Sequence, residues 1–434
     1  MQSSPRVLVI AEAANPEWVS VPLIGWLLSR ALAEVADVHV ATQIRNRTAF
    51  LRAGLREGID FTAIDSEHVE ARSIDLANKL RMGQGKGWTT LQAFQSLTYP
   101  YFERLLWDTL GEDIVNKKYD IVHRITPMSP TSPSPIAARC EAAGVPFVLG
   151  PINGGLPWPK EFGTERRRER EWLSYVRGAY KFLPGHKQTL DAARAIIVGS
   201  SYTASEIPQE YRHKSIEISE SAVDLSRFSL PVKEGISEPL SACFIGRLVP
   251  YKGPDMLLEA AAPLLRSGKL RLDIIGDGPL MDDIKQIMAR EDIEKAVELH
   301  GWVPHQQLQD IAIRSDIFTF PSIREFGGTS ILETMALGLI PVIVDYGGPG
   351  DNIPDHVGFK LPLGSKQNIV DELRQVLTKI SDNPAQLLDM RCRGREWIEQ
   401  KYTWPQRAGQ ISEVYRWVLG ERAHRPQPFQ WRTA

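Results

Sequence analysis

The chain has 434 residues, about three times the size of a typical single domain, so we expect two or three domains. Hydrophobic residues make up 43% and charged residues 24%, which excludes a disordered chain, a collagen-like fibre and a coiled coil. The 51 Lys and Arg residues nearly balance the 53 Asp and Glu residues, giving a net charge of −2, so the chain has no global positive field for a nucleic-acid backbone. We therefore expect no nucleic-acid partner.

The cysteines and the apolar runs bear on the cellular location. Cys140, Cys243 and Cys392 lie far apart and form no pair spaced like a metal site, which favours a reducing, cytoplasmic location. The N-terminal apolar run, residues 7–11, is too short for the core of a signal peptide. No uninterrupted apolar run is long enough to cross a bilayer, so any membrane contact should be peripheral, on the inner face.

Short apolar runs rich in β-branched residues alternate with longer amphipathic stretches in both halves of the chain. In the first half the runs that predict strands are 6–11, 38–42, 59–64, 119–123, 145–150, 195–200 and 215–219. In the second half they are 241–246, 270–276, 297–300, 317–320 and 341–345. Because strands buried on both faces have such near-continuous apolar sequences, each half predicts a parallel sheet wrapped in helices. The expected fold class is α/β, with two Rossmann-like doubly wound domains.

The domain boundary is predicted in the segment 228–239, which contains Pro231, Gly235 and Pro239 and shows little periodicity. We therefore expect an N-terminal domain over 1–227 and a C-terminal domain over 228–403. Residues 404–434 are predicted to form a last helix and a polar tail, and we expect this helix to cross back to the N-terminal domain.

The strongest group of candidate site residues lies between Phe318 and Gly350. It predicts a strand, a loop with Glu325, a glycine pair and a helix that starts at Thr329 and Ser330. Glycines let a ligand approach the backbone, and a helix N-terminus offers free N–H groups, a combination that suits a phosphate. Glu333, one turn into the helix, could accept hydrogen bonds from a ribose diol, and Glu325 could reach sugar hydroxyls. Alternatively, Glu333 complements the helix dipole and Glu325 is solvated surface.

A second group follows the strand predicted to end at Gly246, where Arg247 and Lys252 occupy the loop before a helix. Ligands of open α/β sheets bind beyond the carboxyl ends of strands, so these cations could neutralise a diphosphate. The alternative is two ordinary surface cations in a turn. Two weaker glycine-containing turns follow, at 272–280 and 299–305.

Together these blocks resemble the retaining nucleotide-sugar glycosyltransferases of glycosyltransferase family four, the group 1 enzymes with the GT-B architecture. The resemblance rests on GRLVPYKG, IGDGP, LHGWV and MALGLIPVIV, and above all on Glu325 and Glu333 with seven residues between them. It is dense over residues 240–350. It implies transfer of a sugar from a nucleoside-diphosphate sugar to a carbohydrate or lipid-linked acceptor hydroxyl. It also implies that no metal ion and no cofactor other than the donor is needed, and the sequence shows no DxD-like motif at a plausible strand end.

The resemblance assigns roles by position. Arg247 and Lys252 would hold the donor diphosphate and stabilise its departure, Glu325 would contact the donor sugar, and Glu333 would bind the ribose. Backbone N–H groups would hold the phosphates. The remaining residues expected to line the donor site are Gly246, Gly276, Gly278, Gly301, Trp302, Val303, Phe326, Gly327, Gly328, Thr329 and Ser330.

The N-terminal half departs from the family pattern. The glycine pair common after the first strand is replaced by AEAANPEW, residues 11–18. Asn153, Gly154 and Gly155 could take its place, or form a simple loop. His123 ends a predicted strand in the region where the family often has a donor-facing histidine, although an isolated histidine is more often structural.

Two further segments are candidates for contact with the acceptor and with a membrane. Lys86, in the Gly-rich loop 83–90, could close over an acceptor, with Arg45, Arg47 and Arg52 on the same side; an ordinary mobile loop is the alternative. The segment 160–187 combines basic flanks with an apolar stripe, which suits an interfacial helix on anionic lipid or, alternatively, packing on the N-terminal sheet.

Three other functions remain open at this point. A synthase for a small disaccharide or a sugar phosphate would share the same sequence blocks. A nucleotide-sugar epimerase on the same fold, or an inactive protein that only binds sugar nucleotides, would belong to different functional classes.

Overall fold

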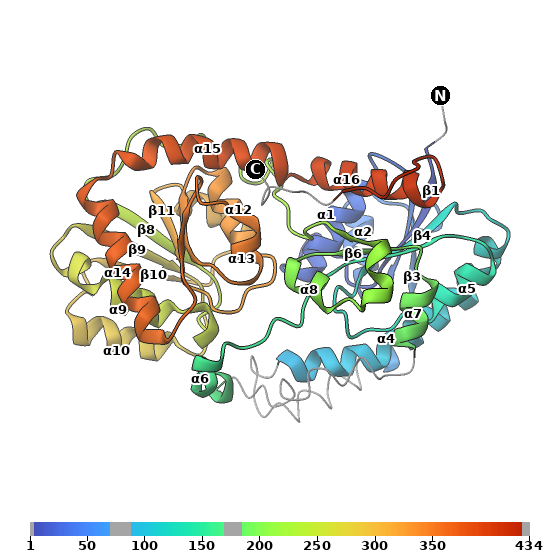
Figure 1. The fold of residues 1–434 in the computed structure, drawn as a ribbon, viewed down its shortest axis with the longest axis horizontal. Coiled ribbons are helices and arrows are strands. Elements are labelled where there is room, and N and C mark those ends of the chain that lie inside the picture. The colour runs from blue at the N-terminus through green and yellow to red at the C-terminus, as the bar shows by residue number, and fades with distance from the viewer. Residues whose placement is uncertain (1–3, 70–87, 169–184, 428–434) are drawn as a thin grey trace. The chain divides into compact units, whose positions relative to one another are not determined.

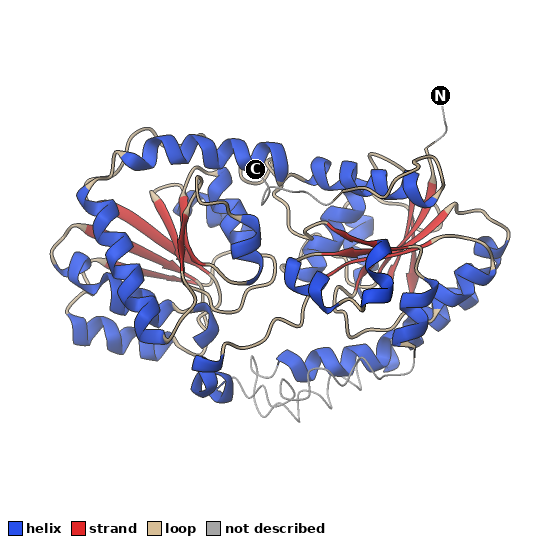
Figure 2. Cartoon of the chain, viewed as in Figure 1, coloured by secondary structure: helices blue, strands red, loops and turns tan. Residues whose placement is uncertain are grey.

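The computed structural model describes residues 4–69, 88–168 and 185–427 (Figure 1). The chain divides into two compact units. The first comprises residues 1–155, 170–220 and 404–434, and the second comprises residues 156–169 and 221–403. Figure 2 shows that each unit has a central sheet with helices around it.

The first unit is built on a seven-stranded parallel sheet of order β3-β2-β1-β4-β5-β6-β7. Its strands are β1 Arg6–Ala11, β2 Asp37–Gln43, β3 Phe61–Ile64, β4 Ile121–Thr126, β5 Phe147–Ile152, β6 Ala195–Val198 and β7 Ser215–Glu217. Every residue of β4 and β5 is buried, which is the pattern of strands covered on both faces.

The helices of the first unit shield this sheet and belong to two packed groups. Contacts join α1 to α16, and they also join α5 to both α4 and α7. An apolar cluster between the sheet and α4 and α5 includes Leu8, Phe102, Val122 and Leu149. The helices are α1 Val21–Leu32, α2 Arg47–Arg52, α4 Trp88–Val115, α5 Ile136–Ala142, α7 His186–Ala192, α8 Ser201–Glu206 and α16 Trp404–Val418.

The second unit has a six-stranded parallel sheet of order β10-β9-β8-β11-β12-β13. Its strands are β8 Leu240–Ile245, β9 Leu270–Ile275, β10 Val297–Gly301, β11 Ile317–Phe320, β12 Ile340–Val344 and β13 Phe359–Leu361. The chain runs from β8 to β9 on one side, whereas β11 lies on the other side of β8, so the direction of winding reverses between β8 and β11.

Amphipathic helices cover this sheet. In α14 the buried residues recur every three or four positions, at Ile369, Leu373, Leu377 and Ile380, so one apolar stripe faces α9 and the sheet. A second group joins α12 to α15. The helices are α6 Gly163–Arg168, α9 Pro254–Arg266, α10 Met281–Glu291, α11 Leu308–Ala312, α12 Thr329–Ala336, α13 Gly347–Asn352, α14 Lys366–Asp382 and α15 Gln386–Lys401.

The structure confirms the expected fold class, and each strand predicted from the sequence is present. The prediction omitted β13, a strand of three residues. The contact-defined units differ from the expected domains in two places. Residues 221–227 and 156–169 group with the second unit, the latter because Trp158 and Phe162 join its apolar core. Helix α16 groups with the first unit.

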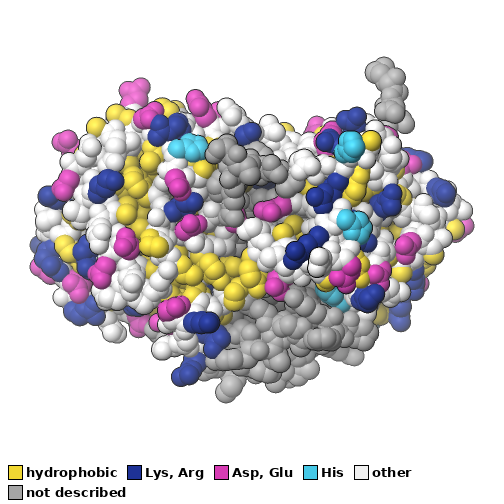
Figure 3. Space-filling view, viewed as in Figure 1, with side chains coloured by type: hydrophobic (Ala, Val, Ile, Leu, Met, Phe, Trp, Pro, Cys, Tyr) yellow, Lys and Arg dark blue, Asp and Glu magenta, His cyan; other side chains and the backbone are white. Residues whose placement is uncertain are grey.

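The described helices and surface add two observations about possible partners. No helix within the described residues is long and apolar enough to cross a membrane. On the face drawn in Figure 3, basic and acidic side chains are interspersed over both units, in keeping with the small net charge. Residues 169–184, which contain the apolar stripe considered for a membrane, lie outside the described residues.

Candidate active site

The candidate site lies where the winding of the second sheet reverses, at the carboxyl ends of β8 and β11. In open α/β sheets the loops that leave two such strands diverge, and ligands bind between them. The loop after β8 contains Arg247 and the short 3₁₀ turn Pro250–Lys252, and the loop after β11 contains Glu325. The topology therefore brings together segments that are more than seventy residues apart in the sequence.

Lys252 and Glu325 form an ion pair across this point of the sheet. The Lys252 Nζ lies 3.3 Å from Oε2 of Glu325, and the two side chains are only 19% and 20% exposed. The ammonium group also lies 5.1 Å from the ring centroid of Phe320, the last residue of β11. In this partly desolvated position each charge is screened less than it would be on an open surface. The structure thus places two of the residues predicted for the donor site in direct contact.

Backbone contacts hold the two loops against one another. The carbonyl oxygen of Tyr251 accepts a hydrogen bond of 2.9 Å from the N–H of Ile323 and one of 3.1 Å from the Ser322 hydroxyl. Gly253, with a φ of +70°, then turns the chain into α9, where a side chain would press on Pro321. These contacts fix the spacing between Lys252 and the loop after β11.

Glycines line the carboxyl ends of β8, β9 and β10. The N–H of Gly246 donates to the carbonyl of Ile275 at 3.0 Å, and the N–H of Gly276 donates to the carbonyl of Gly301 at 2.8 Å. A Cβ atom on Gly276 would collide with the carbonyl oxygen of Gly246, and one on Gly278 would lie 2.5 Å from the carbonyl oxygen of Leu248. Gly246, Gly276 and Gly301 therefore form a hydrogen-bonded glycine layer, and a side chain at Gly276 or Gly278 would not fit against the neighbouring backbone.

The glycine pair before α12 is held by a residue that the sequence analysis did not identify. Gly328 caps the helix with a φ of +67°. The side-chain amide of Asn352 donates a 2.9 Å hydrogen bond to the carbonyl of Gly327, and its oxygen lies 3.2 Å from the hydroxyl of Tyr402. At the start of α12, the Thr329 hydroxyl lies 3.1 Å from that of Ser221, the first residue of the segment 221–403 of the second unit.

Glu333 is buried and has a partner that the sequence analysis did not assign. Its Oε1 lies 2.9 Å from Nε2 of His305, and the side chains are 11% and 18% exposed, respectively. In the sequence His305 is only the last residue of the glycine-containing turn 299–305. No spacing rule links position 305 to position 333, because the contact depends on how the turn after β10 packs on α12.

The remaining predicted donor-site residues lie in the loops after β8, β10 and β11 and in the first turn of α12. Trp302 follows β10 and is 69% exposed, whereas Val303 packs against the apolar core. Arg247 and Ser330 are partly buried. The guanidinium carbon of the buried Arg324 lies 5.6 Å from the ring centroid of Phe326 and 5.5 Å from that of Trp158.

His123 is a core residue of the first unit, and its contacts correct the expectation of a donor-facing histidine. Its Nε2 lies 2.6 Å from the carbonyl of Gly150 and must donate, so its Nδ1 accepts from the Tyr415 hydroxyl at 2.7 Å. Burial lowers the pKa of His123 to about 4. Both nitrogens are used, so the ring is a neutral structural link between β4 and α16.

We expect this histidine to make stability depend on pH. Between pH 6.5 and about 4 the unfolded chain binds a proton that the folded chain excludes, so stability should fall as the pH falls. The free energy of unfolding should fall by about 1.4 kcal/mol per pH unit, which gives a loss of roughly 3 kcal/mol over the whole window. The free energy of unfolding, measured with denaturant at several pH values, should change less steeply with pH for His123→Gln than for the wild type. The exposed His356 provides the control, since His356→Gln should keep the wild-type slope. Equal slopes for all three proteins would contradict the prediction.

The Asn153 segment, expected to bind substrate, carries an internal hydrogen-bond network. The Asn153 Oδ1 accepts from Gly154 N–H at 2.8 Å and lies 2.9 Å from the Ser200 hydroxyl and 3.0 Å from that of Thr203. Its amide donates to Glu220 at 2.8 Å. Asn153, Gly154 and Gly155 thus join β5 to α8 within the first unit, which favours the simple-loop alternative.

Of the residues expected on the acceptor side, the structure describes the three arginines, and each of them lies near a carboxylate. Lys86 lies outside the described residues. Arg47 pairs with Glu57 at 2.7 Å and Arg52 with Glu17 at 2.7 Å, whereas Arg45 lies 3.5 Å from Glu12. Burial raises the pKa of Glu12, and the charge of Arg45 opposes this effect. Arg47 and Arg52 therefore already have carboxylate partners.

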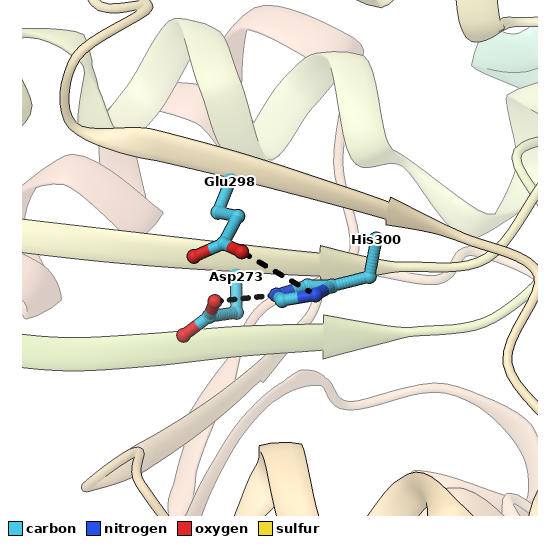
Figure 4. Close-up of side chains that lie close together, drawn as sticks. All are labelled: Asp273, Glu298 and His300. Atoms are coloured by element: carbon cyan, nitrogen blue, oxygen red, sulfur yellow. Dashed lines mark hydrogen bonds and ion pairs between the residues drawn. The ribbon is translucent and has the colours of Figure 1, made fainter.

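One group of His, Asp and Glu side chains among the described residues is close enough to share a metal ion (Figure 4). Asp273 and Glu298 face each other across β9 and β10, and His300 lies two residues further along β10. The His300 Nε2 lies 2.7 Å from Asp273, and its Nδ1 lies 3.7 Å from Glu298. Since the ring turns a different nitrogen to each carboxylate, the imidazole itself bridges the two acids.

Comparison with known proteins identifies the part of the chain that holds this site. Residues 227–395 match the family model described as Glycosyl transferases group 1. The described part of the second sheet thus lies in a segment that is similar to a group 1 glycosyltransferase domain. The matched segment contains the carboxyl ends of β8 and β11. It also contains Arg247, Lys252, Glu325 and Glu333.

Relatives of the group 1 domain have varied substrates. The chain is 28% identical over 210 residues to the phosphatidylinositol N-acetylglucosaminyltransferase gpi3 subunit of Schizosaccharomyces pombe, covering 48% of this chain and 45% of that protein. It is also 28% identical to the 2-deoxystreptamine glucosyltransferase of Streptomyces kanamyceticus, covering 66% of this chain and 74% of that one. The chain thus spans less than half the length of the fission-yeast relative.

Solved structures extend the likeness beyond the group 1 domain to nearly the whole chain. HepE from Anabaena, crystallised with UDP, has a TM-score of 0.62 at 14% identity and covers 94% of this chain and 99% of that chain. A glycosyltransferase from Rickettsia africae has a TM-score of 0.64 at 12% identity, covering 97% and 100%. At these identities the likeness concerns the fold, which is the GT-B architecture of two Rossmann-like domains.

Proposed function

We propose that this protein is a retaining glycosyltransferase that moves a sugar from a nucleoside-diphosphate sugar to an acceptor hydroxyl without a metal ion. The observation that carries the proposal is the Lys252–Glu325 pair at the reversal point of the second sheet. In the proposed reaction Lys252 would neutralise the diphosphate, and the neighbouring Glu325 would contact the sugar. The group 1 family match supports the reaction class. Retention of configuration follows from the resemblance to family four.

The chemistry follows from where charge develops. As the glycosidic bond to the diphosphate breaks, negative charge grows on the leaving phosphate and positive charge on the anomeric carbon. Lys252 and Arg247 would stabilise the phosphate, while Glu325 would bind the sugar hydroxyls and fix the anomeric carbon. The backbone N–H groups at the start of α12, beside Gly327 and Gly328, would bind phosphate oxygens. The protein's own cations would take the place of Mg²⁺.

The proposed acceptor is a carbohydrate or a lipid-linked molecule. Relatives named for lipid substrates include a GDP-mannose-dependent phosphatidylinositol monomannoside mannosyltransferase of Corynebacterium glutamicum, 26% identical over 249 residues. Another is a galactosyltransferase of Escherichia coli named for GlcNAc-diphosphoundecaprenol, 26% identical over 317 residues. A lipid-linked acceptor would also suit peripheral contact with the inner membrane face.

A two-step experiment tests the proposed function. Thermal unfolding with UDP, GDP, ADP and their sugar conjugates should identify the base, because a bound ligand raises the unfolding temperature by mass action. The stabilising sugar nucleotide is then incubated with carbohydrate and lipid-linked acceptors, and the anomeric configuration of the product is read by NMR. Transfer with retention supports the proposal. Interconversion of the donor without an acceptor would instead indicate an epimerase, and binding without turnover an inactive binder.

Removal of divalent metal ions should leave the activity largely unchanged, because the protein supplies the positive charge at the leaving group. The measurement is sugar transfer before and after dialysis against EDTA, with product quantified by mass spectrometry. Activity that disappears with EDTA and returns only with Mg²⁺ or Mn²⁺ would contradict the metal-free mechanism.

A further inference from the structure

The His305–Glu333 contact is a feature of the donor site that the family assignment does not explain. His305 begins the short 3₁₀ turn His305–Gln307 after β10, and Glu333 is the fifth residue of α12. Their side chains meet at 2.9 Å in a partly enclosed position. An ionised carboxylate can only accept hydrogen bonds, so the His305 Nε2 must carry the proton and donate it.

The surroundings of the imidazole restrict how it can turn. Its ring packs edge-on against Phe228, with 5.5 Å between ring centroids and an interplanar angle of 79°. Phe228 itself is 4% exposed and belongs to the apolar core. The His305 Nδ1 is buried and has no hydrogen-bond partner among the described residues. The ring is therefore held by an apolar contact and by one directed hydrogen bond to Glu333.

This bond fixes one oxygen of the carboxylate, and the other has no hydrogen-bond partner among the residues that the structure describes, so it can accept a bond from a ligand. A glutamate side chain has three rotatable bonds, and restricting them in advance lowers the entropy that a ligand must lose when it binds. The Oε1 atom of Glu333 is occupied by His305, so the Oε2 atom becomes the acceptor that remains for a ligand hydroxyl.

We propose that His305 is a positioning residue that orients Glu333 toward the 2′,3′-diol of the donor nucleotide and thereby makes the site selective for ribonucleotides. This inference rests on the proposed function, because it takes Glu333 as the ribose-binding residue. In this role His305 would act through the Glu333 carboxylate, the group to which its Nε2 is hydrogen-bonded.

The test compares binding of a ribonucleotide and its dideoxy counterpart to the full chain. The probes are UDP, GDP or ADP, whichever stabilises the wild type, and the matching 2′,3′-dideoxynucleoside diphosphate, measured by calorimetry. His305→Ala should weaken ribonucleotide binding about tenfold, the range of a hydrogen bond to a charged group. Dideoxynucleotide binding should stay unchanged, since no diol is present. His305→Gln should recover most of the affinity, because its amide N–H can reach the same carboxylate.

Two controls separate positioning from a general structural effect. His356→Ala removes an exposed histidine of the same unit and should change neither affinity. In a Glu333→Ala background, His305→Ala should add nothing, whereas independent sites would give additive losses. Kinetic measurements should show an increased donor KM with kcat nearly unchanged.

The outcomes distinguish this inference from the proposed function. If His305→Ala weakens both nucleotides equally, or adds its full effect without Glu333, the inference is overturned while the glycosyltransferase proposal stands. If His305→Ala fails to fold, His305→Gln and the wild-type preference for the ribonucleotide decide the question. If the wild type binds no nucleoside diphosphate and transfers no sugar, the proposed function fails and the inference fails with it.

Discussion

Replacement of Lys252 by alanine should lower kcat for sugar transfer about 10²–10³-fold, the effect of removing one group that stabilises transition-state charge. The affinity for the free nucleoside should change little, because the nucleoside carries no phosphate for Lys252 to contact. The reason lies in the site geometry, where the ammonium group is partly desolvated and 3.3 Å from Glu325. Steady-state kinetics and nucleoside binding by calorimetry provide the two measurements.

Two controls accompany this variant. Lys269→Ala removes a lysine of the same unit that is 57% exposed and pairs with Asp382, and it should leave kcat within a factor of about two. Glu325→Ala should also lower kcat, and the double variant should lose less than the sum of the two effects, since paired residues couple. Unchanged turnover in both Lys252→Ala and Arg247→Ala would refute the assigned role of these cations.

Gly276→Ala should destabilise the second unit by about 2–4 kcal/mol and abolish most nucleotide binding. Gly276 has a φ of +147°, and a methyl group there would collide with the carbonyl oxygen of Gly246. Relief of this collision requires β8 and β9 to move apart at their carboxyl ends, where the donor is expected to bind. Denaturant unfolding and calorimetry with the stabilising nucleotide measure the two effects.

Gly268→Ala separates backbone strain from the collision. Gly268 also has a positive φ, +70°, but a Cβ atom there would meet nothing within 4 Å. Its substitution should cost only about 1 kcal/mol and leave nucleotide binding intact. If Gly276→Ala behaved like Gly268→Ala, the close approach of the glycine layer would have no functional importance.

The sequence alone predicted much of the fold because buried parallel strands have a distinct local pattern. The runs at 7–11 and 242–245 are continuously apolar, and the helices between strands are amphipathic, so the doubly wound α/β class follows from local spacing. Part of the candidate site follows for the same reason. Lys252 and Glu325 each come shortly after a strand, and carboxyl ends of parallel strands share one edge of the sheet.

The tertiary structure decided which side chains meet within that frame. The sequence left His123 open between a donor-facing and a structural role, and only the contacts with Gly150 and Tyr415, the latter 292 residues away, show a core position. The Asn352 amide on the Gly327 carbonyl and the His305 ring on Glu333 have no local sequence signal either. Short-range periodicity reports whether a residue faces the core. It does not report which distant residue lies opposite, because that partner is set by the packing of whole elements.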